Sequence, residues 1–418
     1  LTKRSPAPTT IFRFNGGAQA GHNVVTADGR HHCFSQFGAG TFDKDAETVL
    51  SASMVVDPLA LEREADHLEH IGVAHPWQRL IIDPNCLVVT RLHRAMNRIR
   101  EKARGAFPHG SCGMGIGEAL TDSQQRKAPC LTVRDLQADD GRGLKLLQGL
   151  LEAKKEELTR LLKTALLDTV LAQALQEACQ EFDQAEQELE AWHRTAQGIL
   201  RMPGLRILPA EAELRRAYRA GRQLLGEGAQ GTLLDPVYGF QPHVTKGRTT
   251  CAKALQLLED NVSREEASVL GVFRAYGHRH GHGPFPTEDG SFEKNCRDPH
   301  NKENAWQGRF RMGWLDLVLT KYAISVNGAL NGLALTCLDQ LSGLDELKAC
   351  VSYEIDTGIG ADARSECARL FTLPDTNSFQ GVASGLKRLD HPSEQQAWRR
   401  TDVLKKAKAK GWKTFPGW

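Results

Sequence analysis

Short apolar runs alternate with helical patterns over the first hundred residues. Residues 58–71 follow the helix-start signal Asp57-Pro58 and carry apolar side chains at helical spacing. Apolar runs of strand length lie at residues 10–14, 54–56, 80–82 and 86–89. Strands that alternate with helices predict an α/β fold, in which a large and mostly parallel central sheet is flanked by helices.

The pattern changes near residue 141. Leucines recur at helical spacing between Lys and Glu up to about residue 201, which predicts a helical subregion over residues 141–222. We favour helices that pack on the sheet over a coiled-coil surface for a partner. From residue 226 the chain is rich in Gly, Pro and Thr, and residues 323–341 return to a helix that precedes a strand at 333–335. A chain of 418 residues can hold one large α/β domain with insertions or two to three domains.

Composition excludes some classes of protein. The 53 Lys and Arg balance 51 Asp and Glu, and a net charge of +2 argues against a general nucleic-acid binder. No apolar run approaches the roughly 18–20 residues of a membrane span. The ten cysteines are scattered, as in a cytoplasmic protein with reduced thiols. The basic residues of the last forty positions alternate with acids, so we favour a solvated helix face over a nucleic-acid tail.

Two glycine-rich segments in the first third of the chain carry candidate chemistry. Residues 15–23 (NGGAQAGHN) follow a predicted strand, and His22 is placed to donate a proton near neutral pH. Residues 110–117 (GSCGMGIG) are typical of a backbone nest for phosphate, although no Walker A lysine follows. A turn histidine and a glycine loop without ligand are the alternatives.

Two further segments lie in the second half. Residues 226–235 (GEGAQGTLLD) contain Gln230, whose amide suits a purine edge. Arg309 and Arg311 lie two residues apart near glycines and can bind a carboxylate through paired hydrogen bonds, or can be solvated. The alternating His278, His280 and His282 leave a metal site open, but the lack of neighbouring Cys or carboxylates disfavours it.

Together, these segments resemble adenylosuccinate synthetase, in that family's order and roughly its spacing. Residues 226–235, 283–288 (GPFPTE) and 313–316 (GWLD) are close to family signatures, and residues 101–105 and 335–339 also match. The resemblance runs with gaps from residue 1 to about residue 353. It implies a single domain over residues 1–418, with an α/β fold related to the P-loop NTPases.

The resemblance also implies an activity. Family members use GTP to phosphorylate the 6-oxygen of IMP, and the amine of aspartate then displaces that phosphate to give adenylosuccinate in AMP biosynthesis. Phosphorylation turns a poor leaving group into a good one. The implied partners are a purine nucleotide, GTP with Mg²⁺, and aspartate, in a cytoplasmic homodimer without nucleic acid or membrane.

Site residues follow from the resemblance position by position. His22 matches the catalytic acid, Gln230 the amide that holds the purine, and the carbonyl of Gly21 a magnesium ligand. Gln19 stands at a substrate-binding position, and Asp339 matches the carboxylate that recognises guanine.

The remaining matched positions contact anionic groups. Arg309 and Arg311 match the residues that bind the carboxylates of aspartate. Arg126 matches a residue that reaches into the site of the second subunit. The contacts to the nucleotide phosphate match Ser111, Cys112, Thr245 and this Arg126.

Several positions depart from the family pattern. The family's phosphate loop, with its catalytic Asp, and its last guanine contacts match nothing in residues 1–418, so we expect both ends to be truncated. Substitutions relative to the family include Gln19 for Asn, Cys112 for Thr, Met114 for Arg, Lys246 for Ser, Cys337 for Lys, and Trp306-Gln307 for two Thr. Two alternatives therefore stay open: a paralogue with another purine acceptor or nucleotide, such as dGMP with ATP, and an inactive nucleotide-binding protein.

Overall fold

The structure is a computed structural model of the 418-residue chain. It describes residues 6–105, 109–165, 169–259, 262, 266–296, 298, 301, 303, 306–358, 361–373 and 380–417. The chain forms two compact units. Unit 1 comprises Leu1–Gln230 with Lys253–Arg264, and unit 2 comprises Gly231–Ala252 with Glu265–Trp418.

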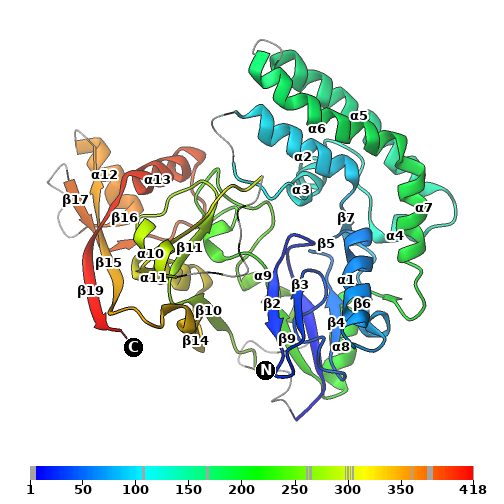
Figure 1. Cartoon of the computed structure of the whole chain (residues 1–418), viewed down its shortest axis with the longest axis horizontal. Helices are drawn as coiled ribbons and strands as arrows, with labels where there is room; N and C mark the ends of the chain where they lie inside the picture. Colours follow the sequence, from blue (N-terminus) through cyan, green and yellow to red (C-terminus); the bar gives the residue numbers. More distant parts are fainter. Residues whose placement is uncertain are drawn as a thin grey trace. The chain divides into compact units, whose positions relative to one another are not determined.

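Unit 1 is built on a five-stranded sheet in which every pairing is parallel (Figure 1). All residues of its strand β1 are buried, as expected for a strand covered on both faces. The order across the sheet is β8 (Arg206–Ile207), β6 (Leu80–Ile82), β4 (Glu47–Leu50), β1 (Thr9–Arg13) and β9 (Gln223–Glu227). The predicted α/β class and parallel sheet are confirmed.

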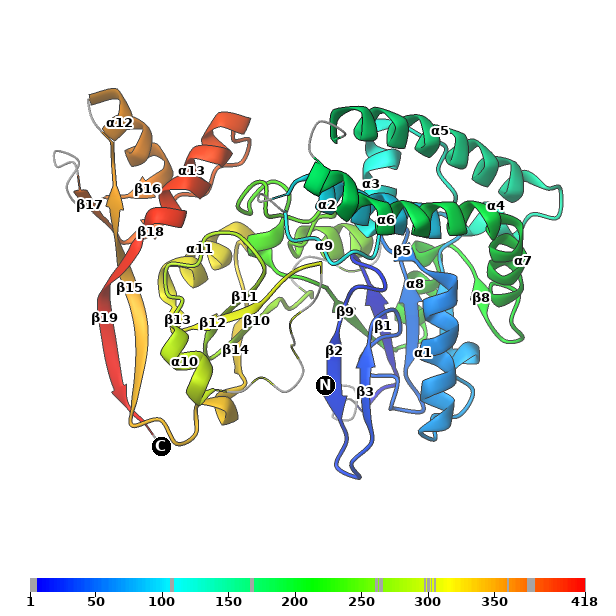
Figure 2. The ribbon, with the colours of Figure 1, turned by 45° about the horizontal axis from the view of Figure 1, so that its top comes forward.

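Helices cover both faces of this sheet. Successive residues of a strand point to opposite faces, so neighbours in one strand pack against different helices. Leu50 packs with residues of α1 (Pro58–His70) in one apolar core. Val49, next in the chain, packs in a second core with Leu214 of α8 (Ala210–Arg219). Figure 2 shows both helices beside the strands. The predicted start of α1 is confirmed, since the Asp57 carboxylate accepts the N–H of Ala60 at 3.1 Å.

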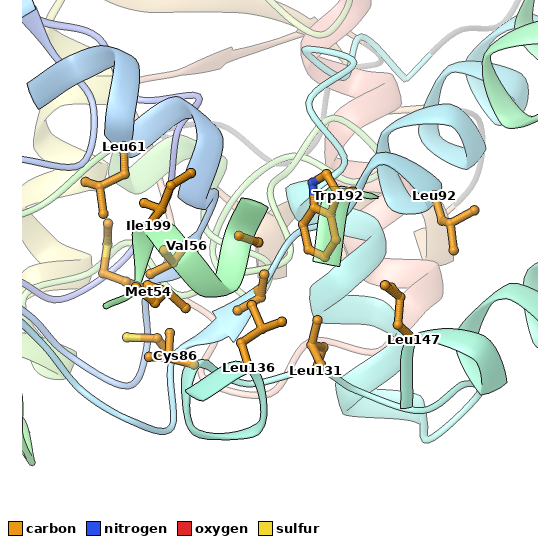
Figure 3. Packing of buried hydrophobic residues seen from close by; sticks show 14 of the residues in the cluster. Met54, Val56, Leu61, Cys86, Leu92, Leu131, Leu136, Leu147, Trp192 and Ile199 are labelled. Atoms are coloured by element: carbon orange, nitrogen blue, oxygen red, sulfur yellow. The ribbon is translucent and has the colours of Figure 1, made fainter. Parts of the chain in front are cut away.

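The leucine-rich segment is helical, and its apolar face belongs to the same core as α1. Figure 3 shows Leu147 of this segment and Trp192 near Leu92 and Leu131. Within it, α5 and α6 pack on α2, and Figure 1 shows the three side by side. The remaining helices of unit 1 are α2 (Arg91–Ala103), α3 (Ile116–Gln125), α4 (Val133–Gln137), α5 (Arg142–Ala165), α6 (Thr169–Gln187), α7 (Leu189–Ile199), the 3₁₀ helix η2 (Pro76–Arg79) and most of α9 (Ala252–Leu258).

Two small strand pairs complete unit 1. The antiparallel hairpin of β2 (His22–Val25) and β3 (His31–Phe34) follows β1. The short strands β5 (Val55–Val56) and β7 (Leu87–Val88) pair in parallel.

Unit 2 contains a four-stranded sheet and three strand pairs. Figures 1 and 2 both show its long strands β15 (Glu346–Asp356) and β19 (Lys408–Pro416) side by side. The strands β13 (Leu315–Asp316) and β17 (Gln380–Ala383) also pair with β15. The pairs are β10 (Leu270–Arg274) with β14 (Gly332–Thr336), β11 (Gly277–His280) with β12 (Phe310–Gly313), and β16 (Phe371–Thr372) with β18 (Gly385–Leu386).

The helices of unit 2 cap and cover these strands. They are α10 (Gly290–Asn295), α11 (Leu317–Asn327), α12 (Ala361–Leu370), α13 (Glu394–Lys406) and the 3₁₀ helices η3 (Thr232–Leu234) and η4 (Leu338–Leu341). Over the described ranges of both units, no helix combines the length and the apolar composition needed to cross a bilayer.

The basic C-terminal segment corrects one prediction. Arg400 on α13 is fully buried and donates hydrogen bonds to the Tyr322 hydroxyl at 2.9 Å and to the Gly239 carbonyl at 3.0 Å. Lys408 and Lys410 lie on strand β19. The prediction of a solvated helix face is therefore wrong for these residues. An edge strand tolerates lysines, so its polar sequence resembles that of an exposed helix.

Asp316 couples the stability of unit 2 to pH. It is buried, its carboxylate accepts the N–H of Leu319 at 3.0 Å at the start of α11, and it also accepts the Tyr353 hydroxyl. Burial raises the pKa of Asp316 to about 6. The folded chain therefore binds this proton more tightly than the unfolded chain does, and the stability that the proton provides is lost as pH rises through about 4 to 6.

We expect Asp316→Asn to remove this dependence and keep the helix cap, because Asn is also a good N-cap. The free energy of unfolding of the wild type, minus that of the variant, should fall by about 2–3 kcal/mol between pH 4 and pH 7. Urea unfolding at a series of pH values measures it. A difference that stays constant with pH would show that Asp316 does not titrate in this range.

Candidate functional site

The ends of β1 and β9 bring two of the predicted loops together. Both strands run in the same direction, so the segments that follow them emerge at the same edge of the sheet. Asn15 joins the two segments: its Nδ2 donates to the carbonyl of Ala229 at 3.0 Å, and its Oδ1 accepts the N–H of Ala229 at 2.8 Å. The first glycine segment and residues 226–230 of the third therefore form one site in unit 1.

Backbone conformation at this edge depends on glycine and on an unusual glutamine. Gly16 has φ +93°, and a Cβ there would lie 2.8 Å from the Cβ of Ala229. Gln230 has φ +62°, a left-handed conformation that non-glycine residues adopt mainly where the surrounding structure imposes it, often at functional sites. The amide oxygen of Gln19 is buried and accepts no hydrogen bond from any described residue. Two amide side chains predicted to bind substrate thus lie on joined loops.

His22 is held by a carboxylate that the sequence analysis did not single out. It opens β2, and its Nδ1 pairs with Oε1 of Glu227, the last residue of β9. Oε2 of Glu227 accepts the N–H of Ala39 at 2.9 Å. Burial alone would raise the pKa of Glu227, but the hydrogen bond from His22 and the positive charge of Arg13 hold that pKa below its usual value. The carboxylate is therefore ionised beside the imidazole.

Helix α2 holds the second glycine segment. The Glu101 carboxylate accepts the N–H groups of His109 and Gly110, both at 3.1 Å. Asn97 donates to the hydroxyl of Ser111 at 2.9 Å. Burial raises the pKa of the Cys112 thiol, so the thiol is neutral and does not repel a phosphate. Arg98 Nε also donates to the carbonyl of Gly113 at 3.1 Å, so both charged and neutral side chains of α2 hold the predicted phosphate loop.

The second segment also adjoins the first. A Cβ on Gly17 would lie 2.5 Å from the carbonyl oxygen of Val55 and 3.0 Å from Cδ1 of Ile116, the first residue of α3. Only glycine allows this approach. Unit 1 therefore gathers residues from three of the four predicted glycine segments at one end of its sheet.

Arg126 lies at the far end of α3. It is exposed and has φ +50° where the helix ends. This placement leaves the side chain on the surface of unit 1, where a residue that serves a second subunit must lie.

In unit 2, Glu288 binds both arginines that were predicted to bind aspartate. Arg311 Nε donates to Oε1 of Glu288 at 2.9 Å, and Arg309 Nη2 donates to the same oxygen at 3.1 Å. Arg311 also donates to the carbonyls of Gly281 at 2.9 Å and Gly283 at 3.0 Å. The hydrogen bond from Arg311 lowers the pKa of Glu288. The two guanidinium groups are thus arranged to bind a carboxylate, and a substrate would compete with Glu288.

We expect Arg309→Ala to raise KM for aspartate about 10- to 100-fold, because it removes charge-assisted hydrogen bonds to a carboxylate. The side chain is 61% exposed, so the melting temperature should stay unchanged. Steady-state kinetics against aspartate concentration, with Lys405→Ala as the exposed control, measures the effect. An unchanged KM would exclude Arg309 from amino-acid binding.

The other predicted residues of unit 2 lie near its loops. The N–H of Thr245 donates to the carbonyl of Leu234 at 2.8 Å. Asp339 is exposed on η4, and its carboxylate accepts a hydrogen bond from Gln340 at 3.0 Å. Cys337, two residues before Asp339, has φ +57°.

The described residues provide no metal cluster of side chains. No group of three or more His, Cys, Asp or Glu able to hold an ion occurs among them, near Gly21 or elsewhere. Burial lowers the pKa of His278 to about 4, and His280 pairs with Asn301 at 3.1 Å. A single carbonyl such as that of Gly21 fits Mg²⁺ that takes its other ligands from phosphate and water.

The sheet edge of unit 1 has the arrangement of a nucleotide-binding α/β protein, in which ligands bind beyond the carboxyl ends of parallel strands. The sequence profile of the adenylosuccinate synthetase family matches residues 5–390. The chain belongs to this family.

Individual relatives agree. Adenylosuccinate synthetase of Salinibacter ruber is 33% identical over 366 residues, which cover 84% of this chain and 76% of the relative. That of Clostridium beijerinckii is 32% identical over 394 residues, covering 90% of this chain and 86% of the relative.

Solved structures share the fold. The fully ligated adenylosuccinate synthetase of Plasmodium falciparum superposes with a TM-score of 0.69 at 20% identity, over 100% of this chain and 83% of the other. Succinoaminodeoxyadenylate synthetase of cyanophage S-2L, bound to dGMP and dATP, gives 0.51 at 19% identity, over 80% of this chain and 78% of the other.

Proposed function

We propose that this chain is a ligase that joins aspartate to the 6-position of IMP in AMP biosynthesis, with GTP as the phosphoryl donor. The family match over residues 5–390 carries this proposal. The joined loops of unit 1 support it, because they present His22, Gln19 and Gln230 from one edge of the sheet.

The residues of unit 1 serve the first chemical step in this proposal. Gln230 binds the purine near its 6-oxygen, and the loop at Ser111 and Cys112 binds the nucleotide phosphate. His22 donates a proton to the phosphoryl group as that group is transferred. The carbonyl of Gly21 would help to hold Mg²⁺, which would neutralise phosphate charge.

The predicted residues of unit 2 also have roles in substrate binding in this proposal. Arg309 and Arg311 bind the carboxylates of aspartate, Thr245 contacts the nucleotide phosphate and Asp339 recognises guanine. We propose that both units act as one domain over residues 1–418, and that Arg126 completes the site of a second subunit in a homodimer. The cytoplasmic location stays a prediction.

The test uses protein expressed from its complete coding sequence. With IMP, GTP, Mg²⁺ and aspartate, it should form adenylosuccinate, detected by chromatography and mass spectrometry. Omission of any one component should abolish the product. Nucleotide binding without turnover, for every donor and acceptor tried, would instead establish an inactive binding protein.

One observation favours a second candidate. Cys337 stands where the family has the Lys that stacks on guanine, while Asp339 is retained. A paralogue that uses dGMP and ATP would explain this change. Product formed from dGMP, ATP and aspartate, but not from IMP and GTP, would support it.

A further inference from the structure

We propose that Glu227 is a positioning residue for His22. Its carboxylate accepts a hydrogen bond from the Nδ1–H group of the imidazole, so that Nε2 is the atom that presents a proton to the transferred phosphoryl group. This inference rests on the proposed function and adds the residue that fixes its acid.

Three interactions fix Glu227, two at its carboxylate and one at its backbone. One oxygen pairs with His22, and the other accepts the N–H of Ala39 at 2.9 Å. The backbone is fixed as well, because Glu227 is the last residue of β9 and pairs in register with Arg13 of β1. Paired residues of neighbouring parallel strands point to the same face, so a buried cation lies beside this carboxylate. A group held in this way can orient a neighbouring ring.

The charges around the pair favour an ionised Glu227. Arg13 is fully buried, and its Nη1 donates to the carbonyls of Ser35 at 2.9 Å and Phe37 at 3.1 Å. Glu64 also interacts electrostatically with this cation, and its carboxylate accepts the N–H groups of Ser35 at 2.8 Å and Gln36 at 2.9 Å. Glu64 is thus occupied by main-chain donors. Glu227 is the carboxylate that pairs with the imidazole.

This arrangement has a defined chemical consequence. A carboxylate on Nδ1 selects the tautomer in which Nδ1 keeps its proton, and it stabilises the imidazolium. During phosphoryl transfer, the N–H bond at Nε2 breaks and an O–H bond forms on the phosphoryl group. The imidazolium becomes neutral imidazole, and the hydrogen bond from Nδ1 to Glu227 remains. Glu227 therefore acts through His22 and does not touch the substrate.

Glu227→Gln keeps the size of the side chain and removes its charge. We expect kcat to fall about 10- to 100-fold with KM for IMP within about threefold, because an acid is weakened and no substrate contact is lost. Glu188→Gln, which removes a half-buried carboxylate of unit 1 that pairs with Arg91 and has no proposed role, should match the wild type.

A double-mutant cycle separates positioning from a general structural role. In the His22→Ala background, Glu227→Gln should cause no further loss of kcat, because its effect passes through the imidazole. A further loss of tenfold or more there would overturn the proposal, as would wild-type kcat in Glu227→Gln alone.

Side-chain ¹⁵N NMR tests the pair without turnover. The signal that disappears in His22→Ala identifies the imidazole. It should report a protonated Nδ1 in the wild type and a change of tautomer or protonation in Glu227→Gln. If the protein forms no adenylosuccinate and the NMR result still holds, the proposed function fails and the pairing stands. An imidazole that is the same in both proteins would overturn the pairing.

Discussion

His22→Ala should lower kcat for adenylosuccinate formation by about 10²- to 10⁴-fold, the range expected for loss of a general acid. KM for IMP and aspartate should stay within about threefold, because the imidazole acts in the transition state more than in ground-state binding. Steady-state kinetics on the purified variant measures both constants.

His31→Ala is the matched control. His31 lies on β3, which pairs with the strand that His22 opens, and it is exposed and hydrogen-bonded to Asn23 at 2.9 Å. It has no proposed role, so kcat should match the wild type. An unchanged rate in His22→Ala would remove His22 as the acid and also the basis for the role of Glu227.

Lys154→Met should lower the free energy of unfolding by about 3–5 kcal/mol, the largest effect on stability that we expect. Lys154 is buried, and its Nζ lies 2.8 and 2.7 Å from the two carboxylate oxygens of Asp122. Met retains most of the apolar volume, so the loss comes mainly from the buried charge of Asp122 left without this partner. Urea unfolding followed by tryptophan fluorescence measures it.

The neighbouring lysine provides the control. Lys155 is 40% exposed and pairs with Glu186 and Glu152, so Lys155→Met should change stability far less than Lys154→Met does. The double variant Asp122→Asn with Lys154→Met should recover part of the loss, because it also removes the buried charge of Asp122, which in Lys154→Met has His93 at 3.3 Å as its remaining partner. Equal effects of Lys154→Met and Lys155→Met would contradict the assigned cost of the buried pair.

The sequence predicted those elements whose signals lie within the element itself or in the residues next to it. Strand β1 was predicted because it combines β-branched and aromatic residues with a following glycine turn, and α1 because Asp57 and Pro58 mark its start. Strand β19 was missed, because lysines on an edge strand lack the alternation that identifies a half-buried strand. Arg400 was misplaced, since the partners that bury it, Tyr322 and Gly239, are distant in sequence.

The candidate site also contains features that the sequence predicted and features that it did not. The glycine segments were recognisable because close backbone approach requires glycine, as the contacts at Gly16 and Gly17 bear out. Glu227 was missed as a partner of His22, because the two residues are 205 positions apart and meet only through the register of β1 and β9. The one sequence signal that could have identified Glu227 is its position between two glycines at the end of a strand. The ion pairs of Glu288 with Arg309 and Arg311 were also missed, because they form only in the tertiary structure.

Non-glycine residues in the left-handed backbone conformation matter for engineering the stability of this protein. Four described non-glycine residues have positive φ, and Arg126, Gln230 and Cys337 among them lie in segments expected to contact ligands. Each conformation costs about 1–2 kcal/mol relative to glycine. A screen that selects only for heat resistance would therefore favour glycine at these positions and discard the recognition chemistry. Selection for thermostability in this scaffold should be paired with selection for turnover.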